Sequence, residues 1–460
     1  MASTLEVVSH PVVFTTQTSY PLPTHKFMIP ASWRRYQLSQ LVNKALTLVK
    51  PVPFDFLIRG EILRTTLGEW CAENSVGEEE TLEIEYIESV MPPQKMSSLP
   101  HEDWVSSISC KQPGYFITGS YDSHLRVFDY SQSLILSSSI HDGPITSLTV
   151  VPRPNGEGET ALVATASYDL SARLTSVDLS PYDTDKDTGA DDGTHSHGRT
   201  HTLASLHLHT APLTSISTDN SGSHLLTTSH DGLIGFWDTS IPTKDEVPLE
   251  PLGGAGDRKK RRKVAKEDED ERAQKLVRKA PVTVLKSHTG RVSKALFVGE
   301  SDKEAVSAGF DSTIRSWDVE NGVCTRTITA SSKPFLDIAI TPSTNTVLAA
   351  STDRTVTQYD LRSSDSTSLS ATITSIMHPT TPSCIALPSS DSQNQNQFVT
   401  GAYDGTVRLW DLRSIKSPVA SFTVWDGKKK VLGVDWRGGV VGVAGEGGVE
   451  VWRINEGDRT

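Results

Sequence analysis

One short phrase recurs along most of this 460-residue chain and constrains its fold more than any other feature. The phrase consists of small residues, an Asp, several further residues and then an aromatic residue that a second Asp usually follows. Its seven copies carry the repeat residues Asp122, Asp169, Asp231, Trp237, Asp311, Trp317, Asp353, Asp404, Trp410 and Trp452. Successive copies lie 42 to 80 residues apart, and the shortest intervals match the ~40–45 residues of one four-stranded propeller blade.

The repeat therefore predicts a seven-bladed WD40 β-propeller, closed by a strand between about residues 91 and 99 that leaves no open sheet edge. A histidine precedes most copies: His101, His141, His209, His288 and His378. In a WD40 blade this histidine, the turn Asp and the strand aromatic form a buried polar cluster, because buried polar groups need partners. We interpret these residues as structural, since a Ser-His-Asp hydrolase would have one distinguished nucleophile rather than a trio in every repeat.

Some copies depart from this pattern. The second has Thr175 and Ser176 in place of the aromatic-Asp pair, and the fifth and seventh lack the histidine. We expect those two blades to be looser or to be held by other contacts.

Residues 1–92 lack the repeat and are predicted to form a separate domain before the propeller of residues 93–460. Two apolar runs at 5–16 and 25–29 are typical of a strand pair, and apolar residues at helical spacing within 32–48 indicate a helix. A strand–turn–strand, a short helical turn and an alternating strand at 81–88 follow. This order is typical of a small α+β ubiquitin-like (β-grasp) domain.

Three consecutive acidic residues, Glu78, Glu79 and Glu80, precede the last strand of that domain. The simplest interpretation is a solvated acidic loop. The alternative is that one carboxylate completes the coordination of a Mg²⁺ ion held by another protein, because Mg²⁺ prefers oxygen ligands and keeps positions open for them. We expect no cofactor of the chain's own, only such an ion shared in trans.

Two long intervals between repeats predict disordered insertions at about 180–201 and 240–281. The first contains His195, His197 and His201, whose tract composition is weak evidence for a metal site. The second contains a basic run, Arg258, Lys259, Lys260, Arg261, Arg262 and Lys263. Such a run is typical of a nuclear import signal, and contact with an RNA backbone or a solvated linker stay open as alternatives. The net charge of −12 argues against a nucleic-acid-binding role for the whole surface.

Composition excludes several other classes of protein. The four cysteines have neither metal nor redox spacing, and no apolar run approaches the ~20 residues that span a bilayer. We expect no membrane partner and no signal peptide. No phosphate-binding loop or nucleophile elbow is present, so the sequence predicts no enzyme.

Two stretches go beyond generic fold patterns: KPVPFDFLIRGEILRTTL at 50–67 and LPHEDWVSSI at 99–108. With them, the chain resembles the YTM/WDR-type WD-repeat ribosome biogenesis factors, the WD-repeat subunit of the PeBoW-type complex, whose N-terminal domain is Notchless-like. The resemblance implies a scaffold for assembly of the large (60S) ribosomal subunit and maturation of 5.8S and large-subunit rRNA precursors. It implies work in the nucleus, nucleolus and nucleoplasm.

The same resemblance implies partners for both domains. The propeller would dock on a BOP-type WD40 protein and, through it, on a pescadillo-type protein in the pre-60S particle. The N-terminal domain would present an acidic residue to the metal site of the midasin AAA ATPase, which would release the subcomplex. Glu79 fits the ligand position best, with Glu78 and Glu80 as register alternatives.

Two other functions remain open at this stage. A Notchless-like assembly factor has the same N-terminal domain type but carries an additional blade. A WD40 substrate adaptor of a ubiquitin ligase would combine a propeller with other modules, but the chain has no F-box-like helical segment. Fold alone does not decide between these functions.

Overall fold

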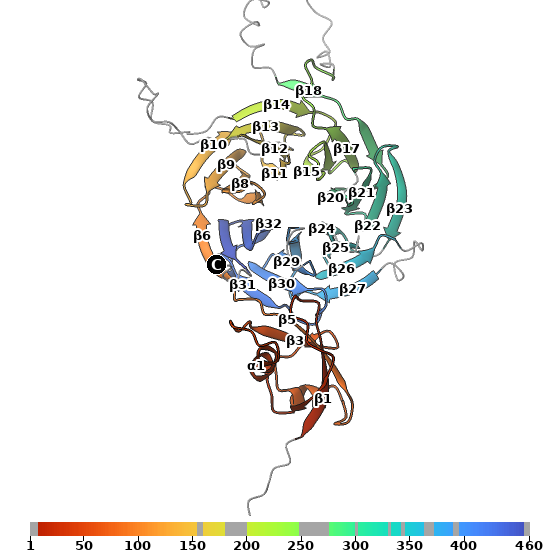
Figure 1. The fold of residues 1–460 in the computed structure, drawn as a ribbon. Coiled ribbons are helices and arrows are strands. Elements are labelled where there is room, and N and C mark those ends of the chain that lie inside the picture. Colours follow the sequence, from red (N-terminus) through yellow and green to blue (C-terminus); the bar gives the residue numbers. More distant parts are fainter. Residues whose placement is uncertain are drawn as a thin grey trace, which may run out of the picture.

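The computed structural model describes residues 8–153, 160–179, 200–247, 276–299, 302–329, 333–341, 346–362, 372–389 and 395–454. This part of the chain is mainly β and forms eight sheets and two α-helices. Seven of the sheets surround a common axis as a ring, and the eighth, with both helices, lies against the outside of the ring (Figure 1).

The N-terminal sheet has the strand order β2-β1-β5-β3-β4, with β1 and β5 parallel. Its elements are β1 (Ser9–Thr15), β2 (Lys26–Pro30), α1 (Arg35–Ala45), β3 (Phe54–Ile58), β4 (Glu61–Ile62), α2 (Leu67–Glu73) and β5 (Leu82–Glu88). Helix α1 buries Leu38 and Val42, which are four residues apart and share one face. Helix α2 begins at a capping box in which Thr66 and Glu69 satisfy each other's backbone N–H groups.

We number the seven ring sheets in chain order. Sheet 1 consists of β7 (Val105–Ser109), β8 (Tyr115–Ser120), β9 (His124–Asp129) and β10 (Leu134–Ser139). Sheet 2 consists of β11 (Ile145–Val151), β12 (Thr160–Ser167), β13 (Ala172–Asp178), β14 (Thr200–Leu206) and β18 (Val277–Lys279). Sheet 3 consists of β15 (Leu213–Thr218), β16 (His224–Ser229), β17 (Leu233–Asp238) and β19 (Thr283–Lys286). In sheets 2 and 3 the first strand, β11 or β15, lies nearest the axis (Figure 1).

Sheets 4 to 7 continue the ring. Sheet 4 consists of β20 (Val292–Phe297), β21 (Glu304–Gly309), β22 (Thr313–Asp318) and β23 (Val323–Thr329), and sheet 5 of β24 (Phe335–Thr341), β25 (Thr346–Ser351), β26 (Thr355–Asp360) and β27 (Thr372–Met377). Sheet 6 consists of β28 (Pro382–Ala386), β29 (Gln397–Ala402), β30 (Thr406–Asp411) and β31 (Ala420–Thr423). Sheet 7 consists of β32 (Val431–Arg437), β33 (Val440–Gly445), β34 (Gly448–Arg453) and β6 (Gln94–Leu99). Apolar residues that alternate along these strands fill the space between neighbouring sheets.

The first and last strands of the ring belong to the same sheet. Strand β6 pairs antiparallel with β34, with Leu99 opposite Val449. The closing strand thus lies where the sequence predicts it. Closure in this way removes the free sheet edge that would otherwise pair with another chain.

The prediction that 180–201 and 240–281 are disordered throughout is wrong at the ends of both insertions. Thr200 and His201 begin β14 and pair with β13. Strand β18 lies within the second insertion and adds a fifth strand to sheet 2, parallel to β14. Its Lys279 is fully buried and forms an ion pair with Asp238 at the end of β17. A residue of the predicted charged linker therefore attaches this strand to the ring. Residues 180–199 and 248–275, with His195, His197 and the basic run, lie outside the described residues.

The N-terminal sheet contacts sheet 6. Val419 packs against an apolar cluster of Leu57, Ile62 and Ile87. Gly60 lies in the turn between β3 and β4 with φ +75°, and a Cβ there would lie 2.9 Å from the carbonyl oxygen of Arg413. This close approach therefore requires glycine at position 60.

Several polar contacts surround this apolar cluster. Arg413 bridges Asp411 of β30 and Glu85 of β5, with distances of 2.7 and 3.1 Å. Lys416 forms an ion pair with Glu61 at 2.9 Å. The N-terminal sheet is thus attached to the ring by both apolar and charged contacts.

Neither described helix is long and apolar enough to cross a membrane. All four cysteines are free, and three of them are buried.

Candidate protein-interaction sites

The predicted polar cluster is complete in sheet 3. His209 Nδ1 lies 3.1 Å from Asp231 Oδ2, and its Nε2 lies 2.9 Å from Thr227 Oγ1. Trp237 donates its indole N–H to the same Thr227 oxygen at 2.9 Å. Because Asp231 also accepts from the backbone N–H of Leu233, the cluster ties the tight turn to the strands on either side of it.

Sheet 4 repeats this arrangement with a serine in place of the threonine. His288 lies 2.8 Å from Asp311 and 2.7 Å from Ser307, and Trp317 donates to Ser307 at 2.8 Å. Burial raises the pKa of Asp311, but the hydrogen bond and charge of His288 outweigh it, so the pKa lies well below its usual range. The carboxylate is therefore charged at neutral pH and holds the imidazole.

Sheet 2 keeps the histidine and loses the aromatic residue. His141 lies 2.7 Å from Asp169 and 2.9 Å from Thr165. Thr175, which stands where the aromatic residue is expected, is fully buried. The decayed sequence copy therefore still forms the His–Asp pair.

In sheet 1 the expected pair is absent. His101 bonds Thr118 Oγ1 at 2.9 Å and the carbonyl oxygen of Leu99 at 3.1 Å, not Asp122. Asp122 instead accepts from Arg126 at 2.6 Å. Burial raises the pKa of Asp122, but hydrogen bonds from this guanidinium and from Ser120 bring it down to about 2. A charge-assisted bond to arginine has replaced the bond to histidine.

Sheet 6 shows the same substitution. Asp404 accepts from Arg408 at 2.7 Å, and His378 bonds only Thr400 at 2.9 Å, with no partner for its Nδ1 among the described residues. Trp410 still donates to Thr400, at 3.0 Å. Burial lowers the pKa of His378 to about 4, as it does for His101, so both imidazoles are neutral at pH 7.

The two copies without histidine have other contacts. The carboxylate of Asp353 accepts hydrogen bonds from the backbone N–H and the hydroxyl of Thr355. Trp452 is only half-buried and donates to Glu450 at 3.1 Å, so it differs from the fully buried tryptophans of sheets 3, 4 and 6. The contacts of these clusters hold turns and strands together, so we assign the clusters a structural role.

The acidic residues Glu78, Glu79 and Glu80 lie in the turn between α2 and β5, and all three are exposed. The carboxylate of Glu80 accepts a hydrogen bond from Arg59 at 2.6 Å. For the other two side chains the structure describes no partner. The turn thus presents two unengaged carboxylates and one that is already paired.

An aromatic surface surrounds Arg291, and the sequence analysis did not identify it. The residue directly before the turn Asp is aromatic or histidine in five repeats, which places these side chains at equivalent hairpin turns on one face of the ring. We define the aromatic face as Arg291 with Trp104, Tyr121, Tyr168, His230, Phe310 and Tyr403. A comparison of the repeats with each other, position by position, would have revealed the pattern.

The aromatic face combines exposure with close contacts. The Arg291 guanidinium lies 4.8 Å from the centre of the Phe310 ring, a cation–π distance. Trp104 and Tyr121 are in ring contact at 6.0 Å, and Tyr168 contacts His230 at 6.2 Å. Burial lowers the pKa of Arg291, and its Nε has no hydrogen-bond partner among the described residues. Arginine and exposed aromatic rings are the groups that dominate binding at protein interfaces.

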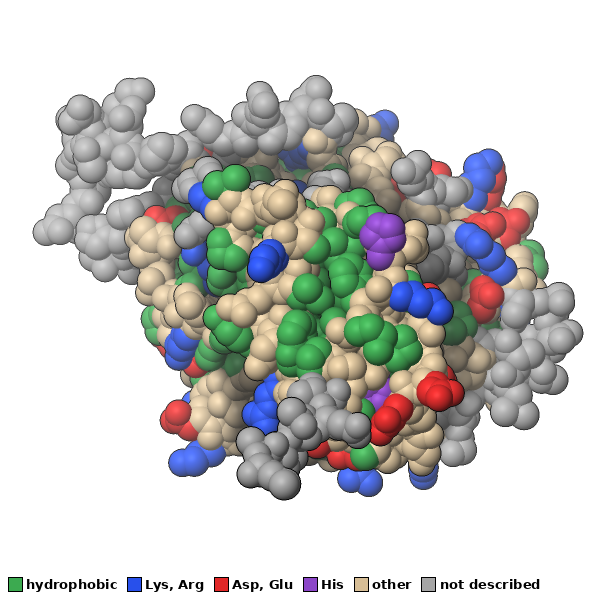
Figure 2. All heavy atoms as spheres, turned by 60° about the horizontal axis from the view of Figure 1, so that its bottom comes forward, with side chains coloured by type: hydrophobic (Ala, Val, Ile, Leu, Met, Phe, Trp, Pro, Cys, Tyr) green, Lys and Arg blue, Asp and Glu red, His purple; other side chains and the backbone are tan. Residues whose placement is uncertain are grey.

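A second apolar surface lies on the side that Figure 2 brings forward, the bottom of Figure 1. Hydrophobic side chains gather on this face, with charged side chains mainly towards its edges (Figure 2). Grouped exposed apolar side chains are typical of protein contact sites.

Comparison with known families defines the class of protein first. Residues 11–71 match the NLE (NUC135) domain, and residues 93–129, 200–238, 322–360 and 371–411 match the WD domain, G-beta repeat. The chain is thus a WD-repeat protein with an N-terminal NLE domain.

Full-length relatives then identify the family. The chain is 57% identical to the ribosome biogenesis protein YTM1 of Laccaria bicolor. The match extends over 453 residues, which are 98% of this chain and 96% of the relative. It is 55% identical to the protein of the same name from Coprinopsis cinerea over 96% and 94% of the two chains. The Saccharomyces cerevisiae protein is 33% identical over 93% and 92%. The chain belongs to the family of ribosome biogenesis proteins YTM1, which confirms the resemblance noted in the sequence.

Proposed function

We propose that this chain is a non-catalytic scaffold in assembly of the large (60S) ribosomal subunit and in maturation of 5.8S and large-subunit rRNA precursors. The family supports a role in ribosome assembly, since its members are named ribosome biogenesis proteins. The observation that carries the scaffold proposal is the aromatic face, a contact surface that the repeats build at one face of the ring. The chain acts in the nucleus, nucleolus and nucleoplasm.

The architecture behind this proposal is a seven-bladed propeller at residues 93–460 and a ubiquitin-like domain at residues 1–92. Seven ring sheets of four or five strands support the blade count. The strand order β2-β1-β5-β3-β4, with a helix between β2 and β3, supports the β-grasp fold. This number of blades also favours the present family over a Notchless-like factor.

The aromatic face docks on the propeller of the BOP-type partner, which holds the pescadillo-type protein on the pre-60S particle. Aromatic side chains provide large contact areas with little conformational freedom to lose, and Arg291 already lies over one of them, Phe310. A folded protein domain with an apolar or acidic contact area is the partner that suits such a surface.

The N-terminal domain presents its acidic turn to the metal site of the midasin ATPase. Glu79 is the ligand, because an exposed carboxylate with no partner among the described residues is free to complete the coordination of a Mg²⁺ ion held in trans. Glu80 is less suited, since it would first have to leave Arg59, and Glu78 is the alternative. Force from the ATPase would then remove the subcomplex from the particle.

The basic run Arg258 to Lys263, outside the described residues, directs nuclear import in this proposal. The same run could alternatively bind precursor RNA, which crosslinking of the purified particle would distinguish.

Two sets of variants test the two contacts separately. Replacement of Tyr168 and Tyr403 by Ser should abolish recovery of the BOP-type partner and leave binding to midasin intact. Glu79→Ala should have the opposite effect. Tyr130→Ser is the matched control, because Tyr130 is more exposed than Tyr403 (58% against 43%) and lies outside the aromatic face. Retention of the BOP-type partner by the double Tyr variant would refute the assignment of the docking surface.

A further inference from the structure

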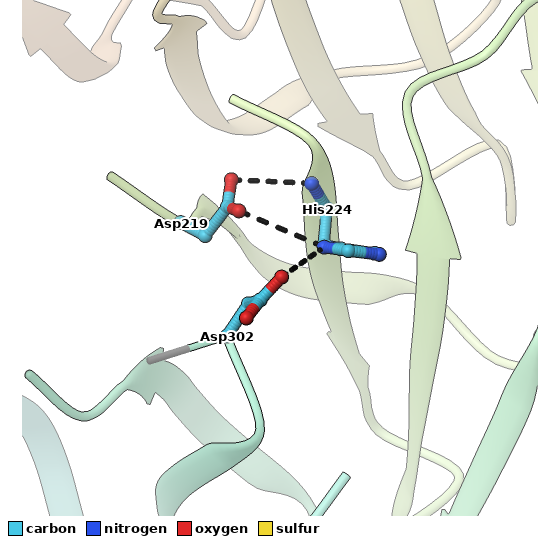
Figure 3. A group of neighbouring side chains, drawn as sticks. All are labelled: Asp219, His224 and Asp302. Atoms are coloured by element: carbon cyan, nitrogen blue, oxygen red, sulfur yellow. Dashed lines mark hydrogen bonds and ion pairs between the residues drawn. The ribbon is translucent and has the colours of Figure 1, made fainter. Parts of the chain in front are cut away.

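A histidine and two aspartates converge at the junction of sheets 3 and 4. Asp219 directly follows β15, His224 begins β16, and Asp302 lies in the connection from β20 to β21 (Figure 3). His224 Nδ1 lies 3.1 Å from Asp302 Oδ2 and 3.6 Å from Asp219 Oδ2. One side-chain atom of each residue lies within 4.8 Å of the other two.

We propose that Asp219, His224 and Asp302 bind one divalent transition-metal ion of the Zn²⁺ class. A tetrahedral Zn²⁺ ion with bonds of ~2.0–2.1 Å places its ligand atoms ~3.3–3.4 Å from each other. The two distances from His224 Nδ1, 3.1 and 3.6 Å, lie on either side of this value. Three protein ligands leave the fourth position for water.

The environment of His224 Nδ1 provides the second observation. This nitrogen is shielded from solvent and makes no hydrogen bond of acceptable geometry within the described residues, although both carboxylates lie close to it. An unsatisfied buried nitrogen is costly. In an ordinary histidine–aspartate pair, the ring N–H points at one carboxylate oxygen. A bound metal ion would instead lie between the oxygens of the two aspartates and accept the lone pair of His224 Nδ1.

The surrounding residues hold two of the three ligands in position. Asp219 is only 4% exposed, and its carboxylate accepts from the hydroxyl of Ser221 at 2.5 Å and from the backbone N–H of His224 at 3.1 Å. The His224 ring stacks on Phe236 with 4.9 Å between centroids and 21° between planes. Ligand orientation by such neighbours is characteristic of metal sites in proteins.

The donor atoms determine which ion fits. One imidazole nitrogen and carboxylate oxygens, with no thiolate, suit Zn²⁺ and its neighbours in the first transition row. Mg²⁺ and Ca²⁺ prefer oxygen ligands alone and more of them. Two carboxylates also balance the charge of a divalent ion.

A metal ion at this position would connect sheets 3 and 4 and stabilise the start of the second insertion. Asp219 and His224 belong to sheet 3, and Asp302 belongs to sheet 4. Thr239, the first residue after β17, donates its backbone N–H to Ser223 at 2.9 Å and its hydroxyl to Gly222 at 2.8 Å. The turn that carries two of the ligands therefore also holds the chain where it leaves the ring.

The test is titration of the metal-free full-length protein with ZnSO₄, followed by calorimetry and by the thermal unfolding midpoint. We expect one Zn²⁺ per chain at this site and a higher midpoint when it is bound. Asp302→Asn and His224→Gln should each weaken this binding by at least ~10-fold, the scale seen when metal sites are perturbed. Asp302→Asn changes a half-buried loop residue to a side chain of the same size and is therefore expected to fold.

Two controls separate this site from others. His124→Gln alters a histidine that lies 3.5 Å from one aspartate only and should leave Zn²⁺ binding unchanged. Replacement of His195 and His197 by Ala should leave the same single ion bound, because those residues are not its ligands. Absence of Zn²⁺ binding at micromolar concentration, or equal binding by wild type, Asp302→Asn and His224→Gln, would overturn the proposal and leave the cluster as an ion pair.

Discussion

Arg413 is the residue whose loss should separate the N-terminal sheet from the ring most effectively. Its guanidinium makes two hydrogen bonds to Asp411, at 2.9 and 2.7 Å, and a third to Glu85 at 3.1 Å. Asp411 is fully buried, while the Arg413 side chain is 21% exposed. Arg413→Ala therefore leaves a buried carboxylate without its cation and removes the contact to β5.

The magnitude follows from this burial. Removal of one partner from a buried ion pair costs about 3–5 kcal/mol. Asp411 keeps the hydrogen bond from the backbone N–H at position 413, so we expect the lower end of that range. Lys416→Ala removes an exposed ion pair with Glu61 and should cost less than about 1 kcal/mol. Lys416→Ala is thus a matched control at the same interface.

Urea unfolding of the full-length protein measures these differences, and the rate of limited proteolysis at residues 89–93 measures release of the N-terminal domain. Arg413→Ala should lower the unfolding midpoint and accelerate cleavage. Adding Asp411→Asn to it should recover part of the loss, because the uncompensated charge is then absent. Equal effects of Arg413→Ala and Lys416→Ala would refute the reasoning.

Three further predictions concern pH, partner binding and import. The folded-state pKa of His378 is about 4, below its usual 6.5, so the unfolded chain binds more protons between these values and stability should fall as the pH decreases through that range. By pH 5 the loss should be about 2 kcal/mol, and His378→Gln should show a correspondingly flatter dependence of urea midpoint on pH. Glu79→Ala should leave the thermal midpoint unchanged and abolish Mg²⁺-dependent binding to the midasin metal-site domain in a pull-down; full binding by each of Glu78→Ala, Glu79→Ala and Glu80→Ala would contradict the ligand assignment. Neutral residues at 258–263 should shift a fluorescent fusion towards the cytoplasm, and undiminished nuclear accumulation would argue against the import signal.

The repeat pattern predicted the sheets because each copy carries its own turn and its own alternation of apolar residues. The side-chain contacts were less predictable. An arginine stands four residues after the turn Asp in sheets 1, 2, 4 and 6. It takes the carboxylate from the histidine at Asp122 and Asp404, where it lies 2.6 and 2.7 Å away, but stays 3.7 Å away at Asp169 and Asp311. Identical spacing thus gives two outcomes, and only the three-dimensional packing decides between them.

Contacts between distant segments were the other source of error. Strand β18 pairs with a strand more than seventy positions earlier in the chain. It is too short and contains too few apolar residues for the sequence to predict a strand within a charged insertion. Asp302 meets His224 only because sheets 3 and 4 are neighbours in the ring. Most of the aromatic face, by contrast, is predictable from the sequence, because five of its residues occupy the same repeat position, directly before the turn Asp.

Affinity purification of the tagged chain from its own cells tests the central claim most directly. The scaffold proposal predicts recovery of the BOP-type and pescadillo-type proteins together with large-subunit precursor RNA, and loss of all three in the Tyr168/Tyr403 double variant. Recovery of ubiquitin-ligase subunits without precursor RNA would contradict it.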